Sequence, residues 1–98
     1  MNYETFANTY QSDSTDKILL DVRKPEEYSE GNLTGSINIP VQVLEERFSE
    51  LEKSKKIYIY CRSGGRAQKA VEILKKNSFE KIEVCSEGGF EQLTPLIK

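Results

Sequence analysis

Two kinds of hydrophobic pattern alternate along the chain. Short runs rich in aliphatic or aromatic residues predict strands, and they lie at residues 18–22, 36–39, 57–60 and 82–84. Apolar positions spaced three or four residues apart predict amphipathic helices, and they lie at residues 2–11, 41–51, 67–76 and 90–97. A shorter helical turn begins at Pro25. Strands that alternate with helices through short connections form β-α-β units, so the pattern predicts an α/β fold with a mainly parallel sheet.

The strand at residues 57–60 leads into the most informative loop of the chain. The loop reads Cys61-Arg62-Ser63-Gly64-Gly65-Arg66, and a helical stripe that starts at Ala67 follows it. Cys61 is therefore expected at the carboxyl end of a strand and just before a helix. Binding sites of parallel sheets lie at the carboxyl ends of strands.

This loop has the composition of an anion site built around a thiol. The first amides of a helix have no acceptor within the helix and carry the positive end of its dipole. Gly64 and Gly65 allow neighbouring N–H groups to turn inward. Such surroundings, with two arginines nearby, favour the thiolate form of a cysteine. The alternative is a small buried cysteine beside an ordinary glycine turn, although that alternative does not explain Arg62 and Arg66.

Composition limits the classes of partner. A chain of 98 residues with 31% charged residues is expected to form one soluble domain over residues 1–98. The net charge of −2 gives no reason to expect nucleic acid or a membrane surface as partner. Positive charge is instead local, at Arg62, Arg66 and Lys69. The residues after Met1 show no export signal, so a cytoplasmic location is expected.

The cysteine and histidine counts limit the chemistry further. The sequence has two cysteines and no histidine, so no metal site and no imidazole base are expected. Activation of Cys61 must then be electrostatic, and no cofactor is required. Cys85, which follows the last predicted strand, is either a packed residue or a resolving thiol that faces Cys61.

Asp21 and Arg23 follow the first predicted strand. Asp21 stands where a catalytic carboxylate is possible, but a structural role for both residues is the stronger interpretation. We expect them to orient a loop through hydrogen bonds or to form ion pairs with nearby side chains.

Three stretches of the chain together resemble the rhodanese-like family in its single-domain form. The first runs from Asp21 through Tyr28 and continues through Gly31, Gly35, Ser36 and Asn38-Ile39-Pro40. The second is the Cys61–Arg66 loop, and the third is Glu87-Gly88-Gly89-Phe90. Asn32 stands where the family commonly has histidine, and Leu93 where it commonly has tryptophan.

The resemblance implies an α/β/α sandwich on a five-stranded, mainly parallel sheet, with sulfur carried on Cys61 as a persulfide. Cys61 would be the catalytic nucleophile of a sulfurtransferase that moves sulfur from a donor such as thiosulfate to cyanide or a thiol. The substrate-binding residues would be Arg62, Ser63, Gly64, Gly65 and Arg66. Ser63 is more simply interpreted as a turn or helix-cap residue, and each arginine has the alternative of pairing with a surface carboxylate.

Two other functions use a similar loop. A cysteine-dependent phosphatase or arsenate reductase has five residues between its cysteine and arginine, whereas four separate Cys61 from Arg66. Tyr60 also stands where the phosphatases usually have histidine. A relay module that accepts sulfur from one protein and passes it to another needs the same loop as a free-standing enzyme. The expected partners are therefore small sulfur-containing anions and thiols, or a protein that donates or accepts sulfur.

Overall fold

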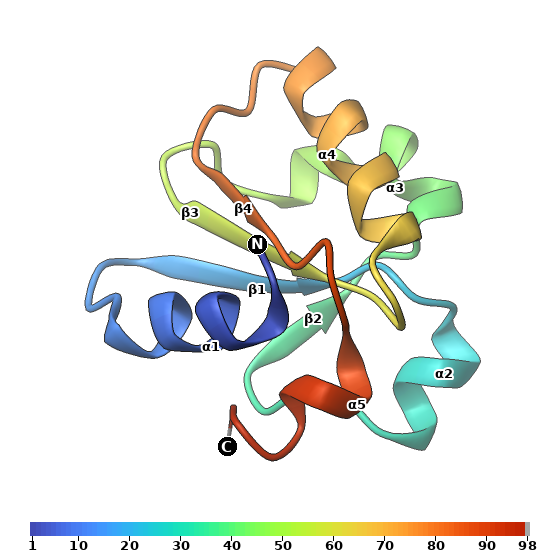
Figure 1. The fold of residues 1–98 in the computed structure, drawn as a ribbon. Coiled ribbons are helices and arrows are strands. Elements are labelled where there is room, and N and C mark those ends of the chain that lie inside the picture. Colours follow the sequence, from blue (N-terminus) through green and yellow to red (C-terminus); the bar gives the residue numbers. More distant parts are fainter. Residues whose placement is uncertain (98) are drawn as a thin grey trace.

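The computed structural model describes residues 1–97 and confirms the α/β fold. Its centre is a four-stranded sheet in the order β2-β1-β3-β4, and every neighbouring pair is parallel (Figure 1). The strands are β1 (Lys17–Asp21), β2 (Ser36–Asn38), β3 (Lys56–Tyr60) and β4 (Ile82–Val84). The expectation of five strands was wrong for the described residues, where the sheet has four.

The position of a fifth strand is reduced to one bridge beside β4. Asn2 forms an isolated parallel bridge with Glu87, and the Ser86 N–H donates to the Met1 carbonyl at 2.9 Å. The first helix starts at Tyr3, and the Asn2 side chain caps it by accepting from the Thr5 amide. Because the chain turns helical at once, too few residues are extended there to make a strand.

Helices cover both faces of the sheet and complete three layers (Figure 1). Helix α3 (Val41–Arg47), the 3-10 turn η1 (Phe48–Glu50) and α4 (Gly65–Lys76) pack on one face. Helices α1 (Tyr3–Ser12) and α5 (Phe90–Leu93) pack on the other, and α2 (Pro25–Glu30) lies beyond the end of β1. No helix within residues 1–97 has the length and apolar character needed to cross a membrane.

The alternating direction of side chains along the strands divides the core into two clusters and separates the two cysteines. Ile57, Ile59 and Cys61 point into the cluster beneath α3 and α4. Tyr58, Tyr60 and Cys85 belong to the cluster beneath α1 and α5. Side chains that differ by one position in a strand point to opposite faces. The two thiols therefore lie on opposite sides of the sheet, and Cys85 does not face Cys61 as a resolving thiol would.

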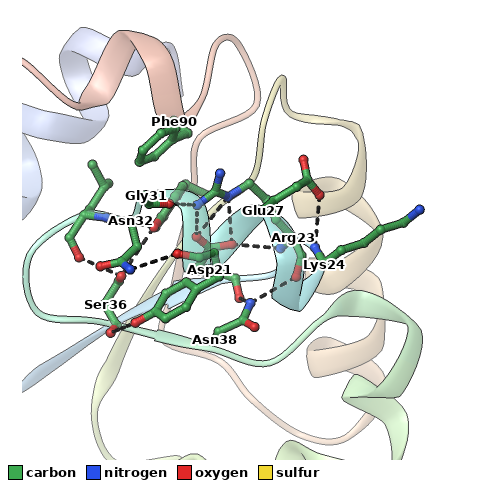
Figure 2. Close-up of polar contacts among 12 residues, drawn as sticks. Asp21, Arg23, Lys24, Glu27, Gly31, Asn32, Ser36, Asn38 and Phe90 are labelled. Atoms are coloured by element: carbon green, nitrogen blue, oxygen red, sulfur yellow. Dashed lines mark hydrogen bonds and ion pairs between the residues drawn. The ribbon is translucent and has the colours of Figure 1, made fainter.

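A buried ion pair organises the segment that leaves β1 (Figure 2). The Arg23 side chain donates to the Asp21 carboxylate, with an Nη2–Oδ2 distance of 2.7 Å, and to the Gly31 carbonyl at the same distance. Asn38 on β2 donates to the carbonyls of both Asp21 and Arg23. Asp21 is fully buried and Arg23 nearly so. The structural role expected for this pair is confirmed.

Asp21→Ala is expected to destabilise the protein by about 3–5 kcal/mol, because it leaves the Arg23 charge buried without its partner. Urea denaturation of the variant and the wild type measures the difference. Glu50→Ala, which breaks an exposed pair with Arg47, is the control and should have a much smaller effect. Equal effects of the two substitutions would contradict the structural role of Asp21.

Candidate active site

Cys61 lies at the junction between β3 and α4, as the sequence predicts. The Gly64 N–H donates to the Cys61 Sγ, with an N–S distance of 3.0 Å. Helix α4 begins at Gly65 with Gly64 as its N-cap, two residues before the apolar stripe starts. The amides of Gly65, Arg66 and Ala67 fall in the first turn, where a helix provides no acceptor. The sulfur is therefore held at the positive end of a twelve-residue helix.

The two glycines of the loop serve different purposes. Gly64 has a φ of 111°, in the region that side chains rarely adopt, and a Cβ there would lie 2.2 Å from the Ser86 carbonyl oxygen. A Cβ on Gly65 would meet no atom within 4 Å. The bend that brings an amide to the sulfur thus needs glycine at position 64 but not at position 65.

The backbone of the segment after β4 packs against the backbone of the cysteine loop. A Cβ on Gly89 would lie 2.2 Å from the Cys61 carbonyl oxygen and 2.3 Å from that of Arg62. The Phe90 N–H donates to the Cys61 carbonyl at 2.9 Å. Only glycine allows the two backbones to approach so closely, which explains physically why the chain needs Gly89 beside this loop.

The Phe90 ring also packs against the segment that follows β1. The Arg23 guanidinium lies over the ring, 4.2 Å from its centroid, and a Cβ on Gly31 would be 3.2 Å from the ring edge (Figure 2). Stacking of a guanidinium on an aromatic face is attractive. All three stretches singled out in the sequence therefore meet around the carboxyl ends of β1 and β3.

Arg66 forms an ion pair with a carboxylate, which is one of the two roles that the sequence analysis considered for it. It pairs with Glu27 of α2 through two bonds, Nη1–Oε1 at 2.6 Å and Nη2–Oε2 at 3.1 Å. The bonds from Arg66 hold the pKa of Glu27 at about 2, well below its usual range. Glu27 is thus ionised at neutral pH. Arg62 and Ser63 are exposed, and Ser63 precedes the residue that caps α4 rather than capping it.

Two cavities adjoin the loop and share Glu27 and Arg62. One measures about 460 Å³ and is completed by Lys24 and Arg66. The other measures about 270 Å³ and is lined by Arg23, Glu27, Glu30, Gly31, Arg62, Phe90 and Glu91. Cys61 lines neither cavity and is 1% exposed. Cys61 is therefore almost wholly buried beside the two cavities.

The sequence did not predict Lys24, Glu27, Glu30 or Glu91 as site residues, although Lys24 and Glu27 lie within the first stretch of the family resemblance. Their charges give no periodic signal, and a mixture of Glu and Lys at a helix end is typical of a solvated surface. The proline-initiated turn at Pro25 indicated α2, but not that α2 lies against the cysteine loop. Lys69, counted among the local positive charges, is exposed on α4 and lines neither cavity.

Cys85 is in a different environment from Cys61. Its thiol donates to the carbonyls of Glu87 and Gly88, at 3.7 Å and 3.5 Å. Burial raises the pKa of the Cys85 thiol to about 11, so it is protonated at neutral pH and a weak nucleophile. Within residues 1–97, no group of three or more His, Cys, Asp or Glu side chains is placed to hold a metal ion.

Comparison with known proteins gives consistent matches. The model of the Rhodanese-like domain family matches residues 4–94. Thiosulfate sulfurtransferase PspE of Escherichia coli is 32% identical over 82 residues, which cover 81% of this chain and 77% of PspE. A candidate sulfur carrier protein, YrkF of Bacillus subtilis, is 38% identical over 82 residues, covering 84% of this chain but 44% of YrkF. The chain thus spans less than half the length of YrkF. A rhodanese-related protein of Thermoplasma volcanium superimposes with a TM-score of 0.78 at 32% identity, covering 95% of this chain and 87% of that protein.

Gly64→Ala is expected to destabilise the protein by about 1–3 kcal/mol from backbone strain, with a further cost from the contact with Ser86. Gly65→Ala is the matched control, because the site has room for a methyl group. It should leave stability within about 1 kcal/mol of the wild type, on the stabilising side. Denaturant midpoints measure both. Equal destabilisation by the two substitutions would contradict this account of the bend.

Proposed function

The chain belongs to the rhodanese-like domain family, and we propose that it moves sulfane sulfur from a donor to a thiophilic acceptor through a persulfide on Cys61. Its relatives include proteins named as sulfurtransferases, which supports sulfur transfer as the reaction class. The observation that carries the proposal is the position of the Cys61 sulfur at the N-terminus of α4, where it accepts a hydrogen bond from the Gly64 amide. The proposed donor is a sulfane-sulfur compound such as thiosulfate, and the proposed acceptor is cyanide or a thiol.

In the first step the Cys61 thiolate attacks the outer sulfur of thiosulfate. A new S–S bond forms to Cys61 while the S–S bond of the donor breaks, and sulfite leaves with the electron pair. The products are the Cys61–S–S⁻ anion and the sulfite dianion, so charge and atoms balance. No proton moves in this step, which is consistent with a chain that contains no histidine.

In the second step the acceptor attacks the outer sulfur of the persulfide and releases the Cys61 thiolate. Between the two steps the terminal sulfur is negatively charged. The free first-turn amides of Gly65, Arg66 and Ala67 are suited to stabilise that charge, because they are preorganised donors. Gly64 and Gly65 would thus act through backbone amides, as expected for substrate-binding residues of this loop.

Arg62 is the proposed contact for the oxyanion part of the donor. It lines both cavities beside the loop, is exposed and forms no ion pair within the described residues. A guanidinium binds a sulfonate through paired N–H groups. Ser63, also exposed in the loop, remains a predicted contact of the same anion.

A protein-to-protein sulfur relay is the second candidate function. Two observations favour it over a free-standing enzyme: the 1% exposure of Cys61 and the similarity to a candidate sulfur carrier. A buried carrier cysteine protects its persulfide from small thiols, and a partner protein would open the loop. Rapid loading of Cys61 combined with slow transfer to cyanide or small thiols is the behaviour that this function predicts.

The test of sulfur transfer is intact-mass spectrometry of the reduced protein after brief exposure to thiosulfate. The wild type and Cys85→Ser should each gain one sulfur atom that a reductant removes, and Cys61→Ser should gain none. Sulfur retained in Cys61→Ser but lost in Cys85→Ser would contradict the assignment of the nucleophile. Loading of neither cysteine by thiosulfate or by an organic persulfide would contradict sulfur transfer itself.

An aryl phosphate serves as the control substrate for the phosphatase alternative. The Cys61–Arg66 spacing is one residue shorter than the phosphatase motif, so we expect no release of phosphate. Turnover that disappears in Cys61→Ser would favour the phosphatase alternative.

A further inference from the structure

The entrance to the Cys61 loop is electrically balanced rather than basic. We define the entrance as the charged residues that line the two adjoining cavities, apart from the buried Arg23. They are three cations, Lys24, Arg62 and Arg66, and three carboxylates, Glu27, Glu30 and Glu91. The charge of Arg23 is matched by Asp21. A site intended to attract a small dianion is expected to carry an excess of positive charge, and this entrance does not.

Glu27 has a special position among the three carboxylates. It lines both cavities, and it holds Arg66 through two hydrogen bonds, of 2.6 Å and 3.1 Å. Its side chain is 26% exposed and that of Arg66 is 29% exposed, so salt screens the pair less than a fully exposed pair but still reaches it. Arg66 is the second residue of α4. Among the cations of the entrance, it is the one whose charge Glu27 neutralises.

We propose that Glu27 is a specificity-determining residue, which neutralises Arg66 and so selects sulfur donors of low negative charge over the thiosulfate dianion. The proposal rests on the proposed sulfur transfer through Cys61 and adds the class of donor. Organic persulfides and thiosulfonates carry at most one negative charge on the sulfur-donating group. The repulsion between such a donor and Glu27 is therefore about half that of thiosulfate, because Coulomb energy is proportional to charge.

A matched pair of donors isolates charge from chemistry. Methanethiosulfonate differs from thiosulfate by a methyl group in place of one anionic oxygen, and so carries one negative charge instead of two. The Cys61 thiolate attacks its outer sulfur, the S–S bond breaks, and methanesulfinate leaves with the electron pair. The product is the same Cys61–S–S⁻ anion. Both donors thus load the same sulfur atom by the same step.

The test is the rate of Cys61 loading by each donor in the wild type and in Glu27→Gln, at low and high salt. The substitution should raise kcat/KM for thiosulfate by about 10-fold and for methanethiosulfonate by about 3-fold, mainly through KM. High salt should reduce both gains. Glu46→Gln, which removes a carboxylate that lines neither cavity, should give neither gain.

The opposite change in thiosulfate loading is expected if Glu27 only positions Arg66. In that case Glu27→Gln would leave thiosulfate loading unchanged or reduce it, and this result would overturn the proposal. Arg66→Gln should slow thiosulfate loading because it leaves the Glu27 charge uncompensated. Adding Glu27→Gln to that variant should recover most of the loss; a double variant no better than Arg66→Gln would also overturn the proposal.

Failure of this proposal is distinguishable from failure of sulfur transfer. If Glu27→Gln loads sulfur on Cys61 without the predicted gain for thiosulfate, sulfur transfer stands and the role of Glu27 is wrong. If no variant loads sulfur from either donor, the Cys61 persulfide itself is wrong, and the role of Glu27 is lost with it.

Discussion

The close approach of the 86–89 backbone to the cysteine loop is the constraint on which the rest of the site depends. Gly89 lies against the carbonyls of Cys61 and Arg62, and Gly64 lies against that of Ser86. These contacts force the chain to bend immediately after β3, which places the first turn of α4 beside the sulfur. The next residue is Phe90, whose ring packs against the Arg23 guanidinium. One packing requirement thus connects the Cys61 loop to the buried ion pair after β1.

The chemistry that this arrangement suits needs no proton transfer from the protein. Transfer of sulfane sulfur exchanges one S–S bond for another, and the leaving groups are stable anions. The protein then has to supply a thiolate, donors for a negatively charged sulfur, and control over which donor enters. In the proposed mechanism, backbone amides at the start of α4 meet the second requirement, and the charges of the entrance meet the third. A chain without histidine is therefore adequate for this reaction class, which is also that of its named relatives.

The elements and the position of the cysteine loop were predictable because their signals are local. Apolar spacing indicated the strands and the long helices, and the position of Cys61 between β3 and α4 followed from them. The start of α4 at Gly65 was not predictable, because Gly65 and Arg66 carry no apolar signal. The pairing of Arg66 with Glu27 joins residues 39 positions apart, and only the placement of α2 brings them together. The fifth strand implied by the family resemblance was reduced to a bridge at Asn2, because the first helix starts one residue later.

The central claim is that the amides at the start of α4 hold the sulfur carried on Cys61. The most direct measurement is the ¹⁵N–¹H spectrum of the labelled protein before and after loading with methanethiosulfonate. Large shifts confined to the amides of residues 62–67 and their neighbours across the sheet end, reversed by a reductant, are the predicted result. Loading confirmed by mass with those amides unshifted, or with the largest shifts around Cys85, would contradict the account.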